Sequence, residues 1–325
     1  MRGMKFVLGS VAPIAAAMLG VAPPAIAQQY PTKPVRIIVP FAPGGGSDFI
    51  ARFTAQRLTA ALGWQVIVEN RPGAGGLLGI ESGVKADPDG YTLTLINSSY
   101  TVNPALYPIK FDPLNDITPV IQVSQGPILV VANPKLPVKT TKELIALAKS
   151  KPGQISFASA GQGSTSHMAA ELFMSTAGIK MNHIPYKGTG PALTDTIGGQ
   201  TEILFSSTAT ALPHVKAGRL RAIAVTTAKR LAAEPDVPAL AESGVPGYDV
   251  ALWHGLVGPK GLPRPVVDRI NTEVNKILKL KETADQLQTD GVSPAGGTPE
   301  KFAEQIRKEV ELWRKVVAAT GVKVE

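Results

Sequence analysis

Strand-like and helix-like segments alternate along most of the chain, and this alternation limits the possible architecture more than any other feature. The strand-like segments are short, β-rich runs: Val35–Val39, Gln65–Glu69, Tyr91–Ile96, Ile128–Ala132, Ile155–Ala158, Ile203–Phe205 and Leu220–Val225. Amphipathic helical patterns lie between several of them. Because such alternation favours crossover connections, the sequence predicts an α/β fold with mostly parallel sheets.

The predicted helices have recognisable faces and ends. The first begins near Phe49, and its apolar face consists of Ile50, Phe53, Leu58, Ala61 and Leu62. A later helix at Leu144–Lys149 follows the capping box Thr140-Thr141-Lys142-Glu143 and is stopped by Pro152-Gly153.

The last third of the chain is mainly helical. Pro265 suits the start of a helix whose apolar stripe consists of Val267, Ile270, Val274 and Ile277. Thr298-Pro299 caps and starts another, whose stripe consists of Phe302, Ile306, Val310, Trp313 and Val317. We expect these two long helices to pack on a domain formed earlier in the chain.

Residues 1–27 have the features of an export signal. Arg2 and Lys5 precede the apolar run Phe6–Ala22, and Ala25-Ile26-Ala27 is a small-x-small cleavage signal. A membrane anchor is the alternative, but the run is short and poor in large apolar residues for a span of about 20 residues. We therefore expect export, with cleavage near Ala27/Gln28.

The chain has no cysteine and a formal net charge of +8. Disulfides, thiolate chemistry and a lipid at the cleavage point are thereby excluded. The remaining length of about 300 residues suits two ordinary domains or one large one, and a core of that size needs no cross-links. We expect a periplasmic protein. The basic residues are scattered, which argues against nucleic-acid binding.

The segment Pro40–Asp48, Pro-Phe-Ala-Pro-Gly-Gly-Gly-Ser-Asp, joins the first strand to the first helix. Glycines let the backbone approach a ligand here, and the helix start directs unpaired N–H groups at it, as in an anion site. A nucleotide P-loop would need a following Lys-Ser/Thr, and a dinucleotide fingerprint would need spaced glycines. A plain tight turn, with Asp48 capping the loop, is the alternative.

A second loop, Phe157–His167, has the same design, because glycines and small hydroxyl residues again lie between a strand and a helix. In an enzyme, one of its serines would be a nucleophile with His167 as its base. No G-x-S-x-G elbow is present, and serines at a helix start usually cap the helix. We therefore favour binding over catalysis.

The histidines lack the spacing of a metal site, and each is interpreted as a local hydrogen-bonding residue: His167, His183, His214 and His254. Trp253 precedes a glycine-rich segment and is a candidate for the border of a cleft. Asn97–Thr101 and Ser206–Thr208 follow strands, where α/β proteins bind ligands. Solvated loops are the alternative for both segments.

Several motifs occur together along the chain: Tyr30–Asp48, Val68–Gly76 (Val-Glu-Asn-Arg-Pro-Gly-Ala-Gly-Gly), Ala86–Tyr91 (Ala-Asp-Pro-Asp-Gly-Tyr), Ile184–Gly188 (Ile-Pro-Tyr-Lys-Gly) and Trp253–Leu256 (Trp-His-Gly-Leu). In this combination the sequence resembles the Bug/TctC solute-binding proteins, the periplasmic receptors of tripartite tricarboxylate transporters and their relatives. The resemblance covers essentially the whole mature chain.

The resemblance implies a two-lobed "Venus flytrap" fold of the periplasmic-binding-protein type, type II-like, with the ligand in the interlobe cleft. Crossings near Gly126 and Val250 would place residues 28–126 plus 251–325 in the first lobe and residues 127–250 in the second. The final helices would then pack on the first lobe. It also implies a monomeric binding protein without cofactor or metal, and not an enzyme.

The resemblance further implies a small carboxylate ligand: a dicarboxylate, a tricarboxylate or an aromatic carboxylate. In such proteins, backbone N–H groups and bridging waters at the first loop hold one carboxylate. Carried over, the ligand-binding residues are Phe41, Ala42, Gly44, Gly45, Gly46, Ser47 and Asp48, then Ala160, Gly161, Gly163, Ser164 and Thr165, with Ser98, Ser99, Ser206, Ser207 and Thr208 as wall residues. The partner would be a tripartite tricarboxylate-type transporter. A membrane sensor is the alternative partner, and a periplasmic hydrolase is the alternative function.

Overall fold

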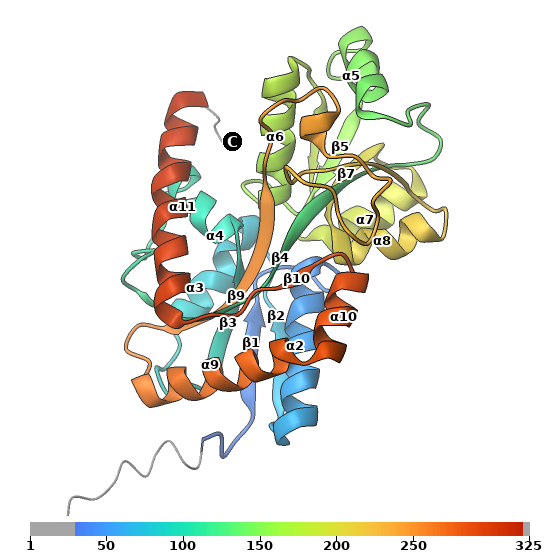
Figure 1. Cartoon of the computed structure of the whole chain (residues 1–325). Coiled ribbons are helices and arrows are strands. Elements are labelled where there is room, and N and C mark those ends of the chain that lie inside the picture. The colour runs from blue at the N-terminus through green and yellow to red at the C-terminus, as the bar shows by residue number, and fades with distance from the viewer. Residues whose placement is uncertain (1–29, 321–325) are drawn as a thin grey trace, which may run out of the picture.

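The computed structural model describes residues 30–320 (Figure 1). The predicted export signal and its cleavage point lie outside the described residues. Within them, the chain forms two α/β lobes joined by strands that cross between them. No helix in residues 30–320 combines the length and the apolar character that a membrane crossing needs.

The sheet of lobe 1 has the order β2-β1-β3-β9-β4. Its strands are β2 (Val66–Asn70), β1 (Val35–Val39), β3 (Thr92–Asn97), β9 (Ala251–Pro259) and the first part of β4 (Ile117–Ala132). β1 is parallel to β2 and β3, whereas β9 is antiparallel to β3 and β4. The short strand β10 (Ser293–Pro294) also pairs with β4.

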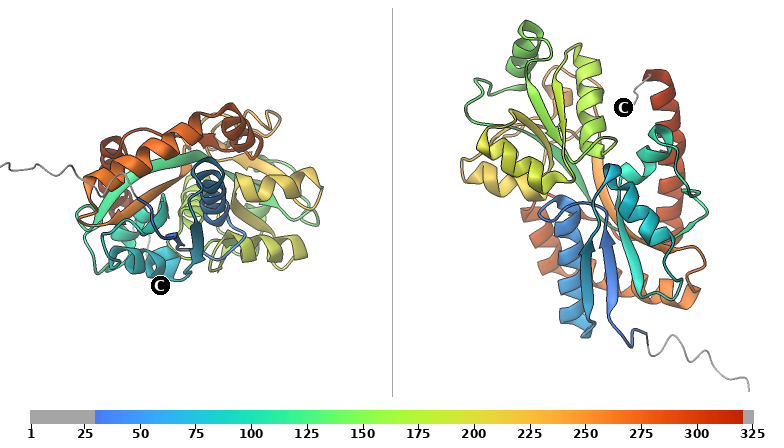
Figure 2. Two further views of the ribbon diagram at one scale, coloured as in Figure 1. Left: turned by 90° about the horizontal axis from the view of Figure 1, so that it is seen from below. Right: turned by 180° about the vertical axis from the view of Figure 1, so that it is seen from behind.

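Helices cover both faces of this sheet. On one face, α2 (Gly46–Leu62) and α9 (Arg264–Lys279) share a core with alternate residues of β1 and β3, and α10 (Lys281–Thr289) follows α9. On the other, α3 (Leu77–Val84), α4 (Ser99–Leu106) and α11 (Pro299–Thr320) pack around Trp253. Figure 2 shows α11 beside α4 on the flank of lobe 1.

Most of the predicted apolar stripes are buried. The α9 stripe is buried as predicted, and so are Phe302, Ile306 and Val310 of α11, while Trp313 and Val317 are half-buried. The predicted face of α2 is too wide, because Ala61 is exposed. The final helices therefore pack on elements formed early in the chain, as the sequence predicts.

The sheet of lobe 2 continues from β4 with the order β4-β7-β5-β6, and β8 pairs with the free side of β4. The strands are β5 (Ser156–Ser159), β6 (Asn182–Pro185), β7 (Ile203–Ser207) and β8 (Arg221–Val225). The helices α5 (Thr141–Ser150) and α6 (Thr165–Ala177) cover one core, while α7 (Thr189–Gly198) and α8 (Thr208–Lys216) cover the other. The predicted capping box is present at the start of α5.

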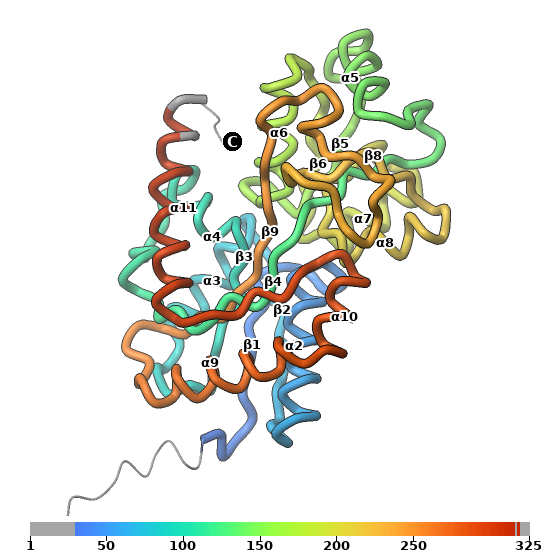
Figure 3. The backbone as a smooth tube through the Cα atoms, in the orientation of Figure 1, coloured from blue at the N-terminus to red at the C-terminus, as the bar shows by residue number. Residues whose placement is uncertain are grey.

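One strand, β4, belongs to both sheets. It pairs with β9 as far as Pro127 opposite Ala251, and from Ile128 onward it pairs with β7 and β8. The chain thus enters lobe 2 along β4 and returns along β9 (Figure 3).

The prediction of mostly parallel sheets is wrong for the centre of the molecule. Parallel pairs are confined to the outer strands, and every described pairing of β4 and β9 is antiparallel. The reason is geometric, because a strand that leaves a lobe and a strand that returns to it run in opposite directions.

Candidate functional site

The loop between β1 and α2 brings the start of a long helix into the interior. Gly45 is the N-cap of α2, with φ −95° and ψ 175°, and no side chain caps the helix. The first N–H groups of α2 therefore lack a side-chain acceptor at the N-cap, and the helix dipole adds a partial positive charge there.

Asp48 holds this loop in shape. Its carboxylate accepts hydrogen bonds from the Gly44 N–H, the Arg52 guanidinium and the Asn70 amide, each at 3.0 Å. Burial raises the pKa of Asp48, but these bonds, led by that from Arg52, outweigh burial and hold the pKa below its usual value. Asp48 is therefore ionised and fully engaged within lobe 1.

The loop between β5 and α6 is held by its own serines. Ser164 is the N-cap of α6 and accepts from the His167 N–H. The Ser166 hydroxyl accepts from the Ala160 N–H at 2.9 Å and lies 3.0 Å from the Ser164 hydroxyl. This second loop thus presents a helix start and small hydroxyl groups to the opposite lobe.

His167 has a structural role in this loop. Its Nδ1 accepts from the Gly163 N–H at 3.2 Å, and its ring stacks on His183 at 4.1 Å. Serine–histidine contacts form instead between Ser159 and His183, at 2.7 Å, and between Ser124 and His254, at 3.3 Å. Ser159 and Ser124 are completely buried. Neither has the access to substrate that a nucleophile needs.

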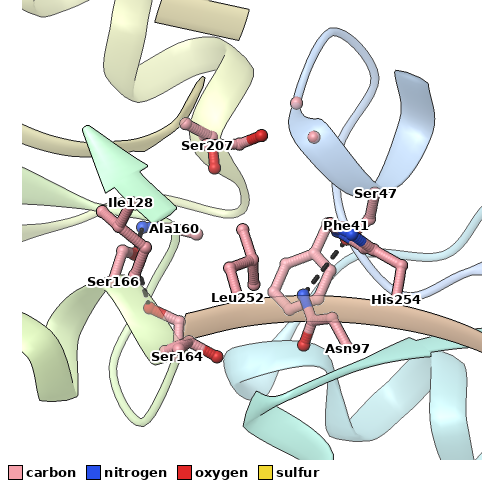
Figure 4. Close-up of a pocket in the computed structure, with 14 residues that line it drawn as sticks. Phe41, Ser47, Asn97, Ile128, Ala160, Ser164, Ser166, Ser207, Leu252 and His254 are labelled. Carbon is pink, nitrogen blue, oxygen red and sulfur yellow. Dashed lines mark hydrogen bonds between the residues drawn. The ribbon is translucent and has the colours of Figure 1, made fainter. Parts of the chain in front are cut away.

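The two loops meet at a small cavity between the lobes. This inner cavity has a volume of about 30 Å³ (Figure 4). Its lining combines the helix starts with residues of the crossing strands: Phe41, Gly45, Gly46, Ser47, Asn97, Ile128, Ala160, Ser164, Thr165, Ser166, Thr189, Ser207, Leu252 and His254. Figure 4 shows Ala160, Ser164 and Ser166 of lobe 2 opposite Phe41 and Ser47 of lobe 1.

A larger cavity adjoins the first. This outer cavity has a volume of about 320 Å³ and shares Phe41 and Ala160 with the inner cavity. Its other lining residues come from the glycine-rich segment before α3, from the end of α4 and from lobe 2: Gly73, Ala74, Gly75, Gly76, Tyr107, Gly161, Gln162, Tyr186 and Lys187.

The lobes are closed on each other. The Ala42 N–H donates to the Lys187 carbonyl at 2.9 Å, and the Tyr107 hydroxyl donates to the Gln162 carbonyl at 2.9 Å. The Ser98 and Thr165 hydroxyls lie 3.0 Å apart. Each of these contacts joins lobe 1 to lobe 2, so opening the cleft would break all three.

The inner cavity carries no formal charge. Burial lowers the pKa of His254 to about 3, so its ring is neutral at physiological pH, and no acidic or other basic residue lines this cavity in the described chain. Among residues 30–320, Lys187 is the one basic residue in the lining of the outer cavity, and no arginine lines either cavity. An anion in the inner cavity would therefore be bound by dipoles and hydroxyl groups.

The structure brings many of the predicted site residues to these cavities. Phe41, Gly45, Gly46, Ser47, Ala160, Ser164, Thr165 and Ser207 line the inner cavity, and Gly161 lines the outer one. Four further predicted residues lie next to the cavities. Ala42, Ser98 and Gly163 make contacts between the lobes, and Gly44 packs near Gly190.

Four predicted residues interact within their own lobe or at the crossing. Asp48 is engaged as described, and Ser99 donates to Asn97. The Ser206 hydroxyl lies 3.1 Å from the Thr210 hydroxyl, and the Thr208 hydroxyl donates to the Pro127 carbonyl.

Sequence reasoning missed several lining residues, above all His254. Residues alternate between the faces of a strand, so Leu252 and His254 face the cavity while Trp253 faces the core. Trp253 is 3% exposed, lies edge-on to Phe302 and donates from its indole N–H to Glu309. The expectation that Trp253 borders the cleft is therefore wrong by one residue.

Two α/β lobes joined by crossing strands and closed over a cavity between two helix starts are the features of a solute-binding protein. The family model described as "Tripartite tricarboxylate transporter family receptor", TctC, matches residues 50–322. The chain belongs to this family.

Individual relatives agree with this assignment. Protein BugT of Bordetella pertussis is 38% identical over 312 residues, which cover 95% of this chain and 96% of BugT. The structure of the periplasmic binding protein BugD has 33% identity and a TM-score of 0.88, covering 91% of this chain and 100% of BugD. The structure of R. palustris Rpa4515 with adipate has 33% identity and a TM-score of 0.87, covering 90% and 99%. The chain is therefore a solute-binding receptor of the Bug type and not an enzyme.

Proposed function

We propose that this receptor captures a small dicarboxylate between its lobes and delivers it to a tripartite tricarboxylate-type membrane transporter from the periplasm. The inner cavity carries this proposal, because two helix starts converge there and no acidic side chain competes with an anion. Backbone N–H groups and hydroxyl groups at helix starts bind carboxylates well. The adipate complex of a relative supports the same ligand class.

The proposed ligand-binding residues are the predicted loop residues together with those that the cavities add. Gly45, Gly46 and Ser47 would hold one carboxylate from lobe 1, and Ser164 to Ser166 would hold it from lobe 2. The lobes are proposed to divide near Gly126 and Val250, where β4 and β9 cross.

The two cavities define the shape of the ligand. On this measure a water molecule needs about 10–15 Å³, so the inner cavity of about 30 Å³ has room for a small headgroup with two oxygens. The ligand body, aliphatic or aromatic, would then occupy the outer cavity of about 320 Å³ beyond Phe41 and Ala160. The ligand must enter while the lobes are apart, because the closed cleft covers the inner cavity.

The expected energies are sufficient for useful affinity. Micromolar binding corresponds to about −8 kcal/mol. A helix start contributes up to about 2 kcal/mol when partly buried, and hydrogen bonds to a charged group contribute about 1.5–3 kcal/mol each. A few such contacts offset the entropic cost of association. Closure follows because only the closed state contacts the ligand from both lobes.

A thermal-shift experiment tests the proposal. The mature protein is heated with a panel of monocarboxylates, dicarboxylates, tricarboxylates and the matching neutral diamides. We expect the melting temperature to rise with at least one dicarboxylate and to stay unchanged with its diamide. A panel without any shift would contradict the proposed function.

We also propose that the receptor acts as a monomer and that its partner is the transporter. Immobilised receptor, with and without ligand, is mixed with detergent-solubilised membranes from cells that produce it. Ligand-dependent capture of transporter subunits is the expected result. Capture of a membrane sensor in their place would assign the receptor to signalling.

A further inference from the structure

Two residues that line the inner cavity each carry a buried polar atom without a hydrogen-bond partner among the described residues, His254 at Nε2 and Ser207 at Oγ. Their side chains belong to residues that are 1% and 4% exposed. A buried polar group without a partner costs stability. Two such atoms on residues that line the same cavity are therefore candidates for bonding one ligand group.

Ser207 occupies a helix N-cap position, where a serine side chain usually accepts a hydrogen bond from a backbone N–H group. It is the N-cap residue of α8, yet its side chain makes no capping bond. N-cap serines normally accept from the first turn of their helix. The Ser207 side chain instead lies close to the opposite lobe, because a Cβ placed on Gly46 would come within 2.4 Å of Ser207 Oγ and 2.5 Å of Ser207 Cβ. The start of α2 thus lies directly against this hydroxyl.

His254 approaches the same point from the crossing strand β9. The Cβ position on Gly46 lies 3.9 Å from His254 Cε1. The other ring nitrogen, Nδ1, lies 3.3 Å from the Ser124 hydroxyl. If Ser124 donates to Nδ1, a neutral ring carries its proton on Nε2. The ring is neutral because burial lowers its pKa to about 3.

We propose that His254 Nε2–H and Ser207 Oγ–H form a neutral donor pair that binds the oxygens of the inner carboxylate and selects this headgroup. The pair completes the start of α2, whose N-cap has no side-chain acceptor. It rests on the proposed function, since it assigns a specificity role within that site. Because no cationic residue of the described chain lines the inner cavity, the pair favours a planar, singly charged carboxylate over a larger, doubly charged phosphonate.

Two substitutions of His254 distinguish the roles of its two ring nitrogens. The side-chain amide of glutamine reaches the position of Nε2, whereas that of asparagine reaches only the position of Nδ1. We expect His254→Asn to weaken binding of the best carboxylate of the panel about 10- to 100-fold, and His254→Gln to restore most of the loss. Calorimetric titration measures both, after the melting temperatures show that the variants fold.

A second pair of variants tests the proposal without changing the buried His254 ring. Ser207→Ala deletes an unpartnered buried hydroxyl in the cleft, and Thr283→Val deletes an unpartnered buried hydroxyl in α10, which lines neither cavity. Both should leave the unliganded protein as stable as before or more so. We expect only Ser207→Ala to weaken binding, about tenfold. Equal affinity in Ser207→Ala, His254→Asn and the unchanged protein would overturn the proposal.

The tautomer gives a readout that needs no ligand. ¹⁵N spectra of the ring in the free protein should show the proton on Nε2, and a proton on Nδ1 would overturn the proposal. In the liganded state, ethane-1,2-diphosphonate, which offers a phosphonate at both ends, should bind at least tenfold more weakly than succinate. Tighter binding of the phosphonate would equally overturn it. A panel without any binding contradicts the proposed function instead, and the ¹⁵N result still decides the donor assignment.

Discussion

Lys187 borders the outer cavity, in which the proposed dicarboxylate would place its second carboxylate. Its ammonium group is exposed, so an ion pair there contributes only about 0.2–1 kcal/mol. We predict that Lys187→Met weakens binding of a dicarboxylate about two- to fivefold. Binding of a monocarboxylate of the same length should not change.

Lys180→Met is the matched control, because Lys180 is an exposed lysine of lobe 2 that lines the groove beside α6 and neither cavity. Calorimetric titrations at low and high salt measure the effect, and salt should reduce the difference between the variants. Equal losses in both variants would mean that Lys187 acts only through the general charge of the lobe.

The sequence predicts the loops of the site better than its strand residues. Gly45, Gly46 and Ser164, which line the inner cavity, could be proposed because glycines and serines at a strand-to-helix junction have a local physical meaning. His254 was missed although it precedes a glycine in a predicted family motif. Its period-2 alternation with Leu252 was the available signal, but using it required knowing that Ala251–Pro259 is a strand.

The start of α2 is the element on which closure depends. Gly46 has an ordinary backbone conformation, so alanine fits lobe 1 without strain. In the closed protein, however, its Cβ would lie 2.4 Å from Ser207 Oγ and 2.5 Å from Ser207 Cβ. We predict that Gly46→Ala leaves the melting temperature of the free protein nearly unchanged, holds the lobes apart, and weakens ligand binding at least tenfold.

Gly198→Ala in α7 is the matched control, since a Cβ there meets nothing within 4 Å and its φ is also ordinary. Small-angle X-ray scattering with ligand present compares the radii of gyration, which should be larger for Gly46→Ala than for Gly198→Ala. Normal affinity in a folded Gly46→Ala variant would show that lobe 2 does not close on the start of α2.

Elements with local signals were predicted well, and elements stabilised by distant contacts were not. β1 was predicted with its observed bounds, and the capping box of α5 is present as predicted. β9 was missed because glycines and a histidine weaken its strand signal. It lies between β3 and β4 and is buried on both faces, so its sequence does not alternate between apolar and polar residues. α10 was missed because it buries little more than Thr283 and Leu287, which give no apolar stripe.

At the scale of the whole molecule, the cavities exist only because distant segments meet. Ala42 bonds Lys187, Ser98 bonds Thr165, and Tyr107 bonds Gln162. No local pattern in the sequence encodes these pairs, so only the resemblance to a family predicted that two loops form one site. The shape of each cavity, and the absence of arginine from their lining, required the structure.

Buried neutral histidines in both lobes make the stability of the whole molecule sensitive to acid. Burial lowers the pKa of His254 to about 3, and burial together with His167 lowers that of His183 to about 3. An unfolded chain protonates histidine near pH 6.5. Because the folded pKa values are depressed, the stabilisation is fully present above pH 6.5 and is lost as the pH falls toward 3.

We predict that the free energy of unfolding falls by about 1.4 kcal/mol for His254 alone between pH 7.5 and pH 5.5, because one proton per molecule is taken up on unfolding below pH 6.5. His183 adds a smaller share, since its ring is partly exposed. Glu309 acts in the opposite direction, because burial raises its pKa above the usual value. The histidines dominate between pH 6.5 and 5.5, above the usual titration range of carboxylates.

Urea unfolding of the free protein at pH 7.5, 6.5 and 5.5 measures this dependence. His254→Gln cannot titrate, so its loss of stability over the same range should be smaller by about 1.4 kcal/mol. His214→Gln is the comparison variant: burial and Arg219 also lower the pKa of His214, but its ring is only half-buried, so its removal should reduce the pH dependence less than His254→Gln does. The same pH dependence in His254→Gln and the unchanged protein would mean that His254 is already protonated, or hydrated, in the folded state. That result would contradict both the neutral state assigned to the His254 ring and the acid sensitivity predicted from it.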